Sequence, residues 1–192
     1  AQKLGYAEAE PSLDVDGIDA AHKLTILAAI AFGQTRQFDK VATSGIRDVS
    51  AVDFAYAKQL GFRIKLVGTA EPGCMPRMQT CLLPMSTQLA KVDGVLNAVE
   101  FDADPVGSVV LTGPGAGSGA TSSAVLSDLV DLACDRIPFT FGRPVAALAD
   151  GSAVENGGGP DTPFYVRLMV VDKPGVLADI TSVLQIHDIS VE

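Results

Sequence analysis

The chain has 192 residues, of which 47% are hydrophobic and 19% are charged, a composition typical of a folded globular protein and not of a disordered one. Its formal net charge of −9 argues against a nucleic-acid partner, because there is no basic surplus to bind phosphates. Three cysteines without a CxxC spacing predict neither a disulfide framework nor a metal site and favour a reducing, cytoplasmic location. No segment is long and apolar enough to predict a membrane span.

Both ends of the sequence suggest a piece of a longer protein. The first residue is not Met, and residues 1–5 look like the last turn of a helix already under way. Residues 188–192, with the sequence DISVE, look like a strand that is cut short. We therefore expect a fragment that is truncated at both ends.

Residues 5–24, GYAEAEPSLDVDGIDAAHKL, place a group of carboxylates ahead of a single lysine. The group comprises Glu8, Glu10, Asp14, Asp16 and Asp19. Asp16 is a suitable N-cap for a helix that ends at Gly33. Because residues 24–32 are apolar nearly all round, we expect this helix to be buried on most sides.

Asp19 and Lys23 stand four residues apart and therefore share one face of this helix. One interpretation is an exposed ion pair, which contributes only a few tenths of a kcal/mol. The other is a pair that moves a proton, with Lys23 at an enclosed boundary near the helix N-terminus. The surplus carboxylates favour the second interpretation, because an ammonium-bearing substrate would give them a partner. Spacing alone leaves both interpretations open.

The next segments predict an alternation of helices and strands. A helix fits residues 51–60, and a short helix or turn is expected at 87–92. Strands are expected at 62–71, 77–84, 95–102 and 107–113, and a further helix at 121–135. Together these segments predict an α+β fold in which helices pack on a mixed β-sheet.

A glycine-rich loop joins the last of these strands to the last of these helices. The helix N-terminus that follows the loop can receive an anion, and the sequence from Gly115 fits GxGxxA, a variant of the dinucleotide fingerprint. No βαβ unit follows the loop, and no acidic residue lies at the expected distance. A phosphate contact and a tight turn that serves packing therefore remain open alternatives.

Residues 137–162 are rich in Gly and Pro and predict a linker between domains. Residues 163–192 follow with the pattern strand, turn, helix, strand. The sequence thus divides into a domain at 1–136, the linker, and a partial βαβ ferredoxin-like unit at 163–192.

In its ordered motifs the chain resembles the homoserine dehydrogenases. Residues 5–24 are similar to the family pattern GYAEADPxxDxxGxDAxxK, and the likeness continues through LGFRIKLVG, LAKVDGVLNAV and GPGAGSGATSSAVLSDLVD. The resemblance implies that residues 1–136 form a catalytic, substrate-binding and dimer-forming domain. It also implies NAD(P)-dependent interconversion of L-homoserine and L-aspartate 4-semialdehyde, in threonine, methionine and isoleucine biosynthesis. The cofactor, NADP or NAD, would be held mainly by an N-terminal domain that is not in this sequence.

By this resemblance Lys23 is the catalytic lysine and Asp19 is its acidic partner in proton transfer. Glu8 matches the glutamate that binds the amino-acid end of homoserine, and Asp14 lies at an acidic position near the substrate. His22 falls at a variable position and is expected to be a bystander.

The glycine loop would supply secondary cofactor contacts, from Gly113, Gly115, Ala116 and Gly117. No metal site is implied. One departure from the family pattern lies at residues 86–88, Ser-Thr-Gln, where the family often has Ser-His-Pro.

The tail resembles the start of an ACT domain, with Asp172, Pro174 and Gly175 in its turn. This implies threonine as an effector and a homo-oligomer, either a dimer or a tetramer, while the fragment alone is expected to be inactive. An alternative function is a non-catalytic, amino-acid-binding regulatory module of the ACT type. A fused aspartate kinase–homoserine dehydrogenase is a further possibility, against which the ACT-like tail argues.

Overall fold

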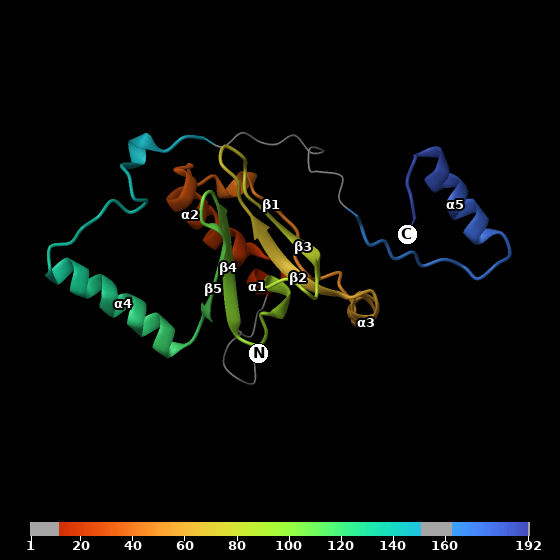
Figure 1. Cartoon of the computed structure of the whole chain (residues 1–192), viewed down its shortest axis with the longest axis horizontal. Helices are drawn as coiled ribbons and strands as arrows, with labels where there is room; N and C mark the ends of the chain where they lie inside the picture. Colours follow the sequence, from red (N-terminus) through yellow and green to blue (C-terminus); the bar gives the residue numbers. More distant parts are fainter. Residues whose placement is uncertain (1–11, 151–162, 192) are drawn as a thin grey trace. The chain divides into compact units, whose positions relative to one another are not determined.

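A computed structural model describes residues 12–150 and 163–191 of the chain. The chain divides into two compact units, Ala1–Pro160 and Asp161–Glu192 (Figure 1). The helices are α1 (Ser12–Val15), α2 (Ile18–Phe32), α3 (Ala51–Gln59), α4 (Ser118–Ala133) and α5 (Val176–Ile186). The strands are β1 (Ala42–Thr43), β2 (Phe62–Thr69), β3 (Arg77–Pro84), β4 (Leu96–Ala103) and β5 (Gly107–Pro114). Short 3-10 turns are η2 (Phe38–Lys40), η3 (Leu89–Lys91) and η4 (Val145–Ala147).

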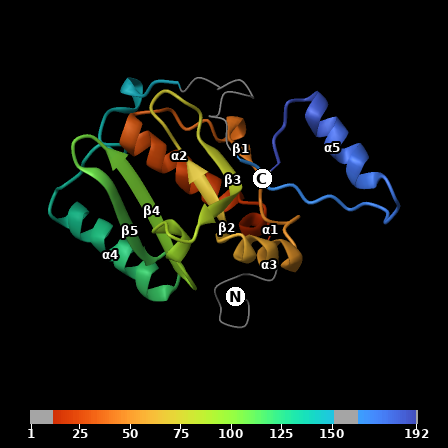
Figure 2. The same cartoon turned by 45° about the vertical axis from the view of Figure 1, so that its right-hand side comes forward.

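A three-stranded sheet with the order β1-β3-β2 forms the centre of the first unit. β1 is parallel to β3, whereas β2 is antiparallel to it, so the predicted mixed sheet is confirmed. Helix α2 runs across one face of β2 and β3 (Figures 1 and 2). Gly68 makes this approach possible, because a Cβ there would lie 2.9 Å from Leu24 Cδ2 and 2.8 Å from Met78 Cε.

Helix α2 is buried along one stripe only. Its buried residues are Ala21, Thr25, Ala28 and Ala29. Their small side chains and their spacing let the helix lie close to the sheet. Ile26 and Ile30 are 44% and 49% exposed, so the prediction of burial on most sides is wrong. Within residues 12–150 the helix is buried along the stripe that faces the central sheet, while the face that carries Ile26 and Ile30 is left exposed.

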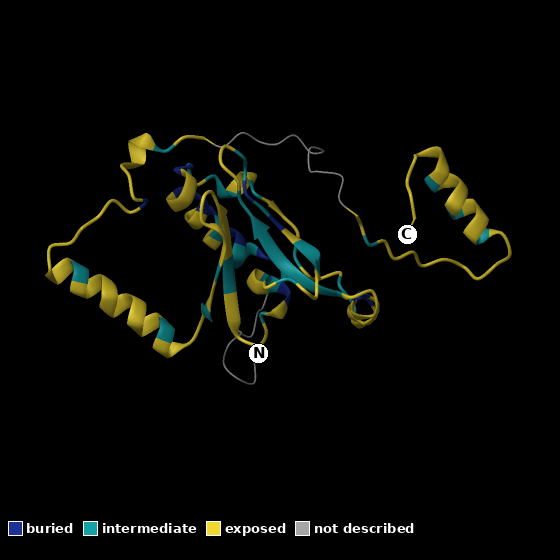
Figure 3. Ribbon diagram, viewed as in Figure 1, coloured by how far each residue is buried: buried dark blue, intermediate teal, exposed yellow. Residues whose placement is uncertain are grey.

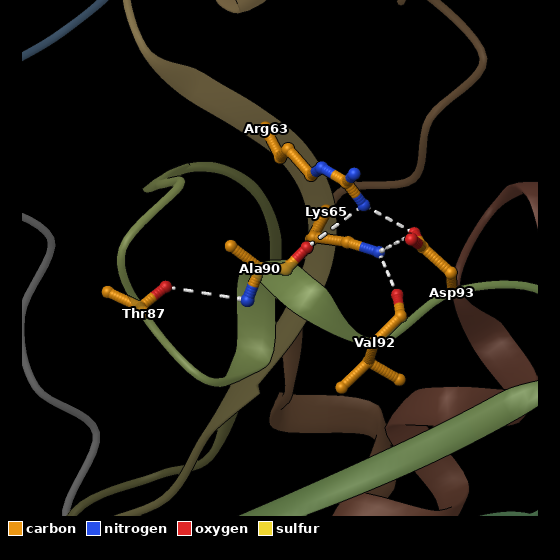
Figure 4. A network of polar contacts seen from close by, with 6 residues as sticks. All are labelled: Arg63, Lys65, Thr87, Ala90, Val92 and Asp93. Atoms are coloured by element: carbon orange, nitrogen blue, oxygen red, sulfur yellow. Dashed lines mark hydrogen bonds and ion pairs between the residues drawn. The ribbon is translucent and has the colours of Figure 1, made fainter.

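The opposite face of β2 carries two cations that anchor the segment around η3 (Figure 4). The Arg63 guanidinium contacts the Asp93 carboxylate and donates to the Ala90 carbonyl oxygen at 3.2 Å. Lys65 Nζ donates to the Val92 carbonyl oxygen and lies 3.7 Å from the same carboxylate. These contacts hold the segment that carries the family-like motif LAKVDGVLNAV against the central sheet.

The loop before η3 contains the departure from the family pattern at residues 86–88. Thr87 Oγ1 donates to the Pro84 carbonyl oxygen at 2.8 Å and accepts the Ala90 N–H at 3.4 Å. The Thr87 N–H also donates to the Pro84 carbonyl oxygen, at 3.0 Å, so the backbone and the hydroxyl of Thr87 close this turn together.

Strands β4 and β5 form a separate antiparallel hairpin, and α4 follows it. Although α4 has 16 residues, none of them is buried (Figure 3). Beyond α4 the chain returns to the main body of the first unit, where Phe141 is buried and Ala149 forms a parallel bridge with Gln34. The segment 141–150 was expected to belong to the linker, yet it is attached to the first unit at Phe141 and Ala149, while most of its other residues are exposed. The other expected linker residues, 151–162, lie outside the described residues.

In the second unit the structure describes residues 163–191, which contain α5 in the place of the predicted helix. Gly175 precedes α5 with φ 95°, a conformation that glycine adopts readily. The predicted strands on either side are wrong, since no strand forms between residues 163 and 191. The two strands that flank the first helix of a ferredoxin-like unit are not neighbours in its sheet, so they cannot pair with each other.

Candidate functional site

The acidic stretch is described only from residue 12 onward, so Glu8 and Glu10 lie outside the described residues. Asp14 is exposed in the short helix α1. Asp19 and Lys23 occupy the first two turns of α2. Between the two helices the chain turns at Gly17, which is buried and has φ 77°.

Asp19 and Lys23 are in direct contact, as both interpretations of their spacing predict. The distance between Lys23 Nζ and Asp19 Oδ2 is 2.7 Å. The two side chains are 62% and 47% exposed, so the expected enclosure of Lys23 is wrong for the chain as it stands. An exposed ion pair of this kind adds little to the free energy of unfolding. Its geometry is compatible with proton transfer, because the carboxylate positions the Lys23 ammonium.

His22 packs next to the pair as part of the helix surface. Its ring stacks on Phe38, with 3.7 Å between the ring centroids and 10° between the planes. The contact fixes η2 beside α2 and gives His22 a packing role, and its place as a bystander to the chemistry stays a prediction.

Asp16 does not cap α2, contrary to the sequence prediction. The N-cap residue is Gly17, and no side chain caps the helix there. Instead, the Asp16 carboxylate accepts two hydrogen bonds from Arg47, from Nε at 2.8 Å and from Nη2 at 2.9 Å. These bonds hold the pKa of Asp16 below its ordinary value. A bidentate guanidinium binds a carboxylate more strongly than a single backbone N–H does, which explains the difference.

The loop that carries Arg47 supports the start of α2 through its backbone as well. The Ile46 N–H donates to the Val15 carbonyl oxygen at 2.8 Å, and Thr80 Oγ1 donates to the Gly45 carbonyl oxygen at 2.8 Å. Gly45 lies so close to Val15 and Asp16 that a Cβ would clash with their backbone. The loop therefore links the α1–α2 junction to β3 and fixes the end of α2 that carries Asp19 and Lys23.

The glycine loop joins β5 to α4. Gly113 is the partner of Asn97 in the hairpin, and Gly115 lies directly against the Asn97 side chain. Gly117 is the N-cap of α4 with φ 106° and ψ 156°, and no side chain caps the helix. The first N–H groups of α4 are therefore not capped by a side chain, and a 16-residue helix with such an end suits an anion.

The structure brings the predicted site residues together in two groups, the pair Asp19–Lys23 and the loop 113–117. Within the described residues, no hydrogen bond or ion pair links Asp14 to Lys23 or joins the two groups. Gly45 and Arg47 were missed by sequence reasoning, because nothing in residues 42–47 indicates a partner that lies 31 positions away in the chain.

The described part of the chain holds neither a membrane-spanning helix nor a cluster of metal-binding side chains. Over residues 12–150 and 163–191, none of the helices combines the length and the apolar character needed to cross a bilayer. The same residues hold no cluster of three or more His, Cys, Asp or Glu side chains suited to a metal ion.

The comparisons with known proteins agree with the motifs. The family model described as homoserine dehydrogenase matches residues 1–130. A homoserine dehydrogenase of Pseudomonas aeruginosa is 44% identical over 202 residues, which cover 100% of this chain and 46% of that protein. A crystal structure of a homoserine dehydrogenase from Thiobacillus denitrificans superposes with a TM-score of 0.75 at 42% identity, over 96% of this chain and 44% of that one.

A hyperthermophilic archaeal homoserine dehydrogenase, solved in complex with NADPH, superposes with a TM-score of 0.57 at 30% identity, over 70% of this chain and 38% of that one. These matches place the chain in the fold class of the homoserine dehydrogenases. The chain belongs to the homoserine dehydrogenase family. It spans less than half the length of the curated relatives that it matches.

Proposed function

We propose that this chain is the substrate-binding and proton-transfer part of a homoserine dehydrogenase that interconverts L-homoserine and L-aspartate 4-semialdehyde. The observation that carries the proposal is the family match over residues 1–130, which includes the whole motif from Gly5 to Lys23. The 2.7 Å contact between Asp19 and Lys23 supports the proposal, because the Asp19 carboxylate fixes the position of the Lys23 ammonium.

In this proposal Lys23 Nζ gives a proton to the aldehyde oxygen as the hydroxyl of homoserine forms, and it takes that proton back in the reverse direction. Asp19 holds the ammonium in place through the 2.7 Å contact between its carboxylate and Lys23 Nζ. Glu8 binds the substrate ammonium, and Asp14 contributes negative charge near it. Arg47 and Gly45 act indirectly, since they fix the junction from which α2 starts.

The glycine loop fits a nicotinamide dinucleotide, because a phosphate can approach the start of α4 where no side chain caps the helix. Gly113, Gly115, Ala116 and Gly117 would make these contacts through their backbone. When bound, the cofactor supplies or accepts the hydride. The NADPH complex of the archaeal relative supports NADP for this enzyme, with NAD as the alternative.

The remaining assignments follow from the family and the tail. We propose a cytoplasmic biosynthetic enzyme that assembles as a homodimer or homotetramer. Residues 163–192 would be part of an ACT unit that takes threonine as an effector, after a catalytic domain at 1–136. By itself the 192-residue chain is expected to have no dehydrogenase activity, since its relatives are about twice as long.

The substitution Lys23→Ala in the complete enzyme tests the proposal. We expect kcat/KM to fall by about 10²–10⁴ while the circular dichroism spectrum and the melting temperature stay unchanged, since general acid–base groups contribute this much and an exposed pair adds little stability. Lys58→Ala, on the exposed surface of α3, is the matched control and should keep wild-type kcat/KM within about twofold. Wild-type turnover by the Lys23→Ala enzyme would overturn the proposal.

The alternative function, a non-catalytic regulatory module of the ACT type, is not favoured. The family model covers residues 1–130 and therefore the part of the chain that contains the proton-transfer pair.

A further inference from the structure

The β4–β5 hairpin is connected to the central sheet at its open end, where β4 begins and β5 ends. Leu96, the first residue of β4, pairs with Pro114, the last residue of β5. The Leu96 N–H donates to the Asp93 carbonyl oxygen at 3.4 Å, and the Asp93 carboxylate lies 3.7 Å from Lys65 Nζ of β2 (Figure 4). The glycine loop leaves the hairpin at this same end, so β2 helps to fix the position from which the loop starts.

Asn97 lies at the open end of the hairpin, with its side chain against the glycine loop. It is the second residue of β4, and its backbone partner in β5 is Gly113. A Cβ at Gly115 would lie 2.6 Å from Asn97 Cγ and closer still to Asn97 Nδ2. The Asn97 carboxamide therefore lies directly on the backbone of Gly115 and occupies the space that a side chain there would need.

The glycines of the loop differ in what a side chain would meet. Gly117 has φ 106°, a conformation that favours glycine. A Cβ at Gly113 would meet nothing within 4 Å. Gly115 does not have a positive φ, and the three atoms nearest to a Cβ at this position all belong to the Asn97 side chain. The missing side chain at Gly115 therefore makes room for the Asn97 carboxamide.

The Asn97 carboxamide is held in place by packing, while its polar atoms have no use within the fold. The residue is exposed, and among residues 12–150 and 163–191 no hydrogen bond involves its side chain. Elsewhere in the hairpin the polar side chains do find partners, since Ser108 Oγ donates to Glu100 Oε1 at 2.7 Å. A carboxamide carries two N–H donors and one accepting oxygen. Because its position is already fixed, binding a ligand with these donors costs little additional side-chain entropy.

We propose that Asn97 is a further cofactor contact, whose Nδ2 donates a hydrogen bond to an acceptor oxygen of the nicotinamide dinucleotide. The proposal rests on the proposed function, which assigns cofactor contacts to the glycine loop. A dinucleotide offers acceptor oxygens on its phosphates and on the carboxamide of its nicotinamide. Asn97 acts by binding and takes no part in proton transfer, so it contributes to the affinity for the cofactor and not to the affinity for the amino-acid substrate.

Titration of the complete enzyme with NADPH, followed by the fluorescence of NADPH, tests the proposal. We expect Asn97→Asp to raise Kd by at least about tenfold, because the carboxylate keeps the shape of the side chain but replaces its donor with a negative charge. Asn97→Ala, which only removes the donor, should raise Kd by about fivefold. Ala103→Asp adds the same charge at the other, exposed end of β4 and should leave Kd within about twofold of wild type.

Steady-state kinetics distinguish a cofactor contact from a general loss of structure. In Asn97→Asp the KM for NADPH should rise in parallel with Kd, while the KM for aspartate 4-semialdehyde stays within about twofold of wild type. The melting temperature without cofactor should stay unchanged, because the exposed carboxylate fills the same space on Gly115. An equal rise of both KM values would overturn the proposal.

A second ligand, phospho-ADP-ribose, is NADPH without its nicotinamide and separates the two kinds of acceptor oxygen. If its Kd rises in Asn97→Asp as that of NADPH does, the acceptor is a phosphate oxygen. If only the binding of NADPH weakens, the acceptor is the carboxamide oxygen of the nicotinamide.

Gly117→Ala in the same titration separates this proposal from the proposed function. Weaker NADPH binding in Gly117→Ala, together with a wild-type Kd in Asn97→Asp, would overturn the role of Asn97 and leave the glycine loop as a cofactor contact. A wild-type Kd in both variants would overturn the role of Asn97 and also the cofactor contacts that the proposed function assigns to the loop.

Discussion

Helices α2 and α4 are nearly equal in length, 15 and 16 residues, and both are rich in apolar side chains, yet they have opposite surroundings. α2 buries a stripe of small residues against the central sheet, and its ends are fixed by the Arg47 loop and by the bridge between Gln34 and Ala149. α4 buries nothing, and its large apolar residues are more than half exposed, namely Val125, Leu126, Leu129, Val130 and Leu132.

The difference shows that apolar content does not decide which helix belongs to the core of this unit. Small residues at the contact let α2 approach β2 and β3 closely, whereas the branched residues of α4 meet no surface within residues 12–150. The candidate proton-transfer pair lies on the packed helix, and the glycine loop lies where the exposed helix begins.

The largest effect is expected from enlarging the buried stripe of α2. Ala29→Leu should lower the free energy of unfolding by about 3 kcal/mol, because Ala29 is 0% exposed and the added carbons have no space. Chemical denaturation measures the change. The matched substitution Ala124→Leu on exposed α4 should stay within about 0.5 kcal/mol of wild type. An equal decrease in the free energy of unfolding in the two variants would show that the two helices do not differ in packing.

A smaller effect is expected where the Arg47 loop meets the start of α2. Gly45→Ala should cost about 2 kcal/mol of unfolding free energy, since its Cβ would clash with the Val15 carbonyl group. Gly119→Ala in α4 is the control, because a Cβ there meets nothing within 4 Å, and it should stabilise the chain by about 0.5 kcal/mol. The prediction fails if both substitutions change stability in the same direction.

The smallest effect concerns acid titration. Arg47 lowers the pKa of Asp16 in the folded chain. The contact therefore adds to the free energy of unfolding at pH values above the ordinary aspartate pKa of about 3.9. This contribution disappears as the pH falls through the pKa of Asp16 in the folded chain. In Arg47→Ala the pKa of Asp16 should rise to its ordinary range, which carboxyl NMR titration measures. Arg136→Ala, which removes a 2.8 Å ion pair with Asp131, should leave the titration of Asp16 unchanged.

Local patterns predicted most elements of the first unit. The strand expected at 77–84 coincides with β3, and the helix expected at 51–60 matches α3, which begins with a capping box between Ser50 and Asp53. Gly33 ends α2 as predicted, through its N–H bond to the Ala29 carbonyl oxygen at 3.0 Å. These features depend on neighbouring residues, which the sequence displays directly.

The errors concern features that depend on distant residues. Asp16 was expected to cap a helix, but its partner Arg47 comes from a loop that no local pattern marks. The strands expected around α5 would require a partner strand between them, which residues 163–191 do not contain. The exposed faces of α2 and α4 likewise depend on what packs against each helix, and an apolar pattern cannot supply that information.

A double-mutant cycle on the complete enzyme tests the central claim, that Lys23 and Asp19 act as one proton-transfer unit. The measurement is kcat/KM for Lys23→Ala, Asp19→Asn and the double variant, with aspartate 4-semialdehyde and NADPH. If the residues act together, the double variant should be no more than about threefold slower than Lys23→Ala alone. The 2.7 Å pair would be only a surface contact if the fold-decreases in kcat/KM of the two single variants multiply in the double variant. A wild-type kcat/KM for Lys23→Ala would lead to the same conclusion.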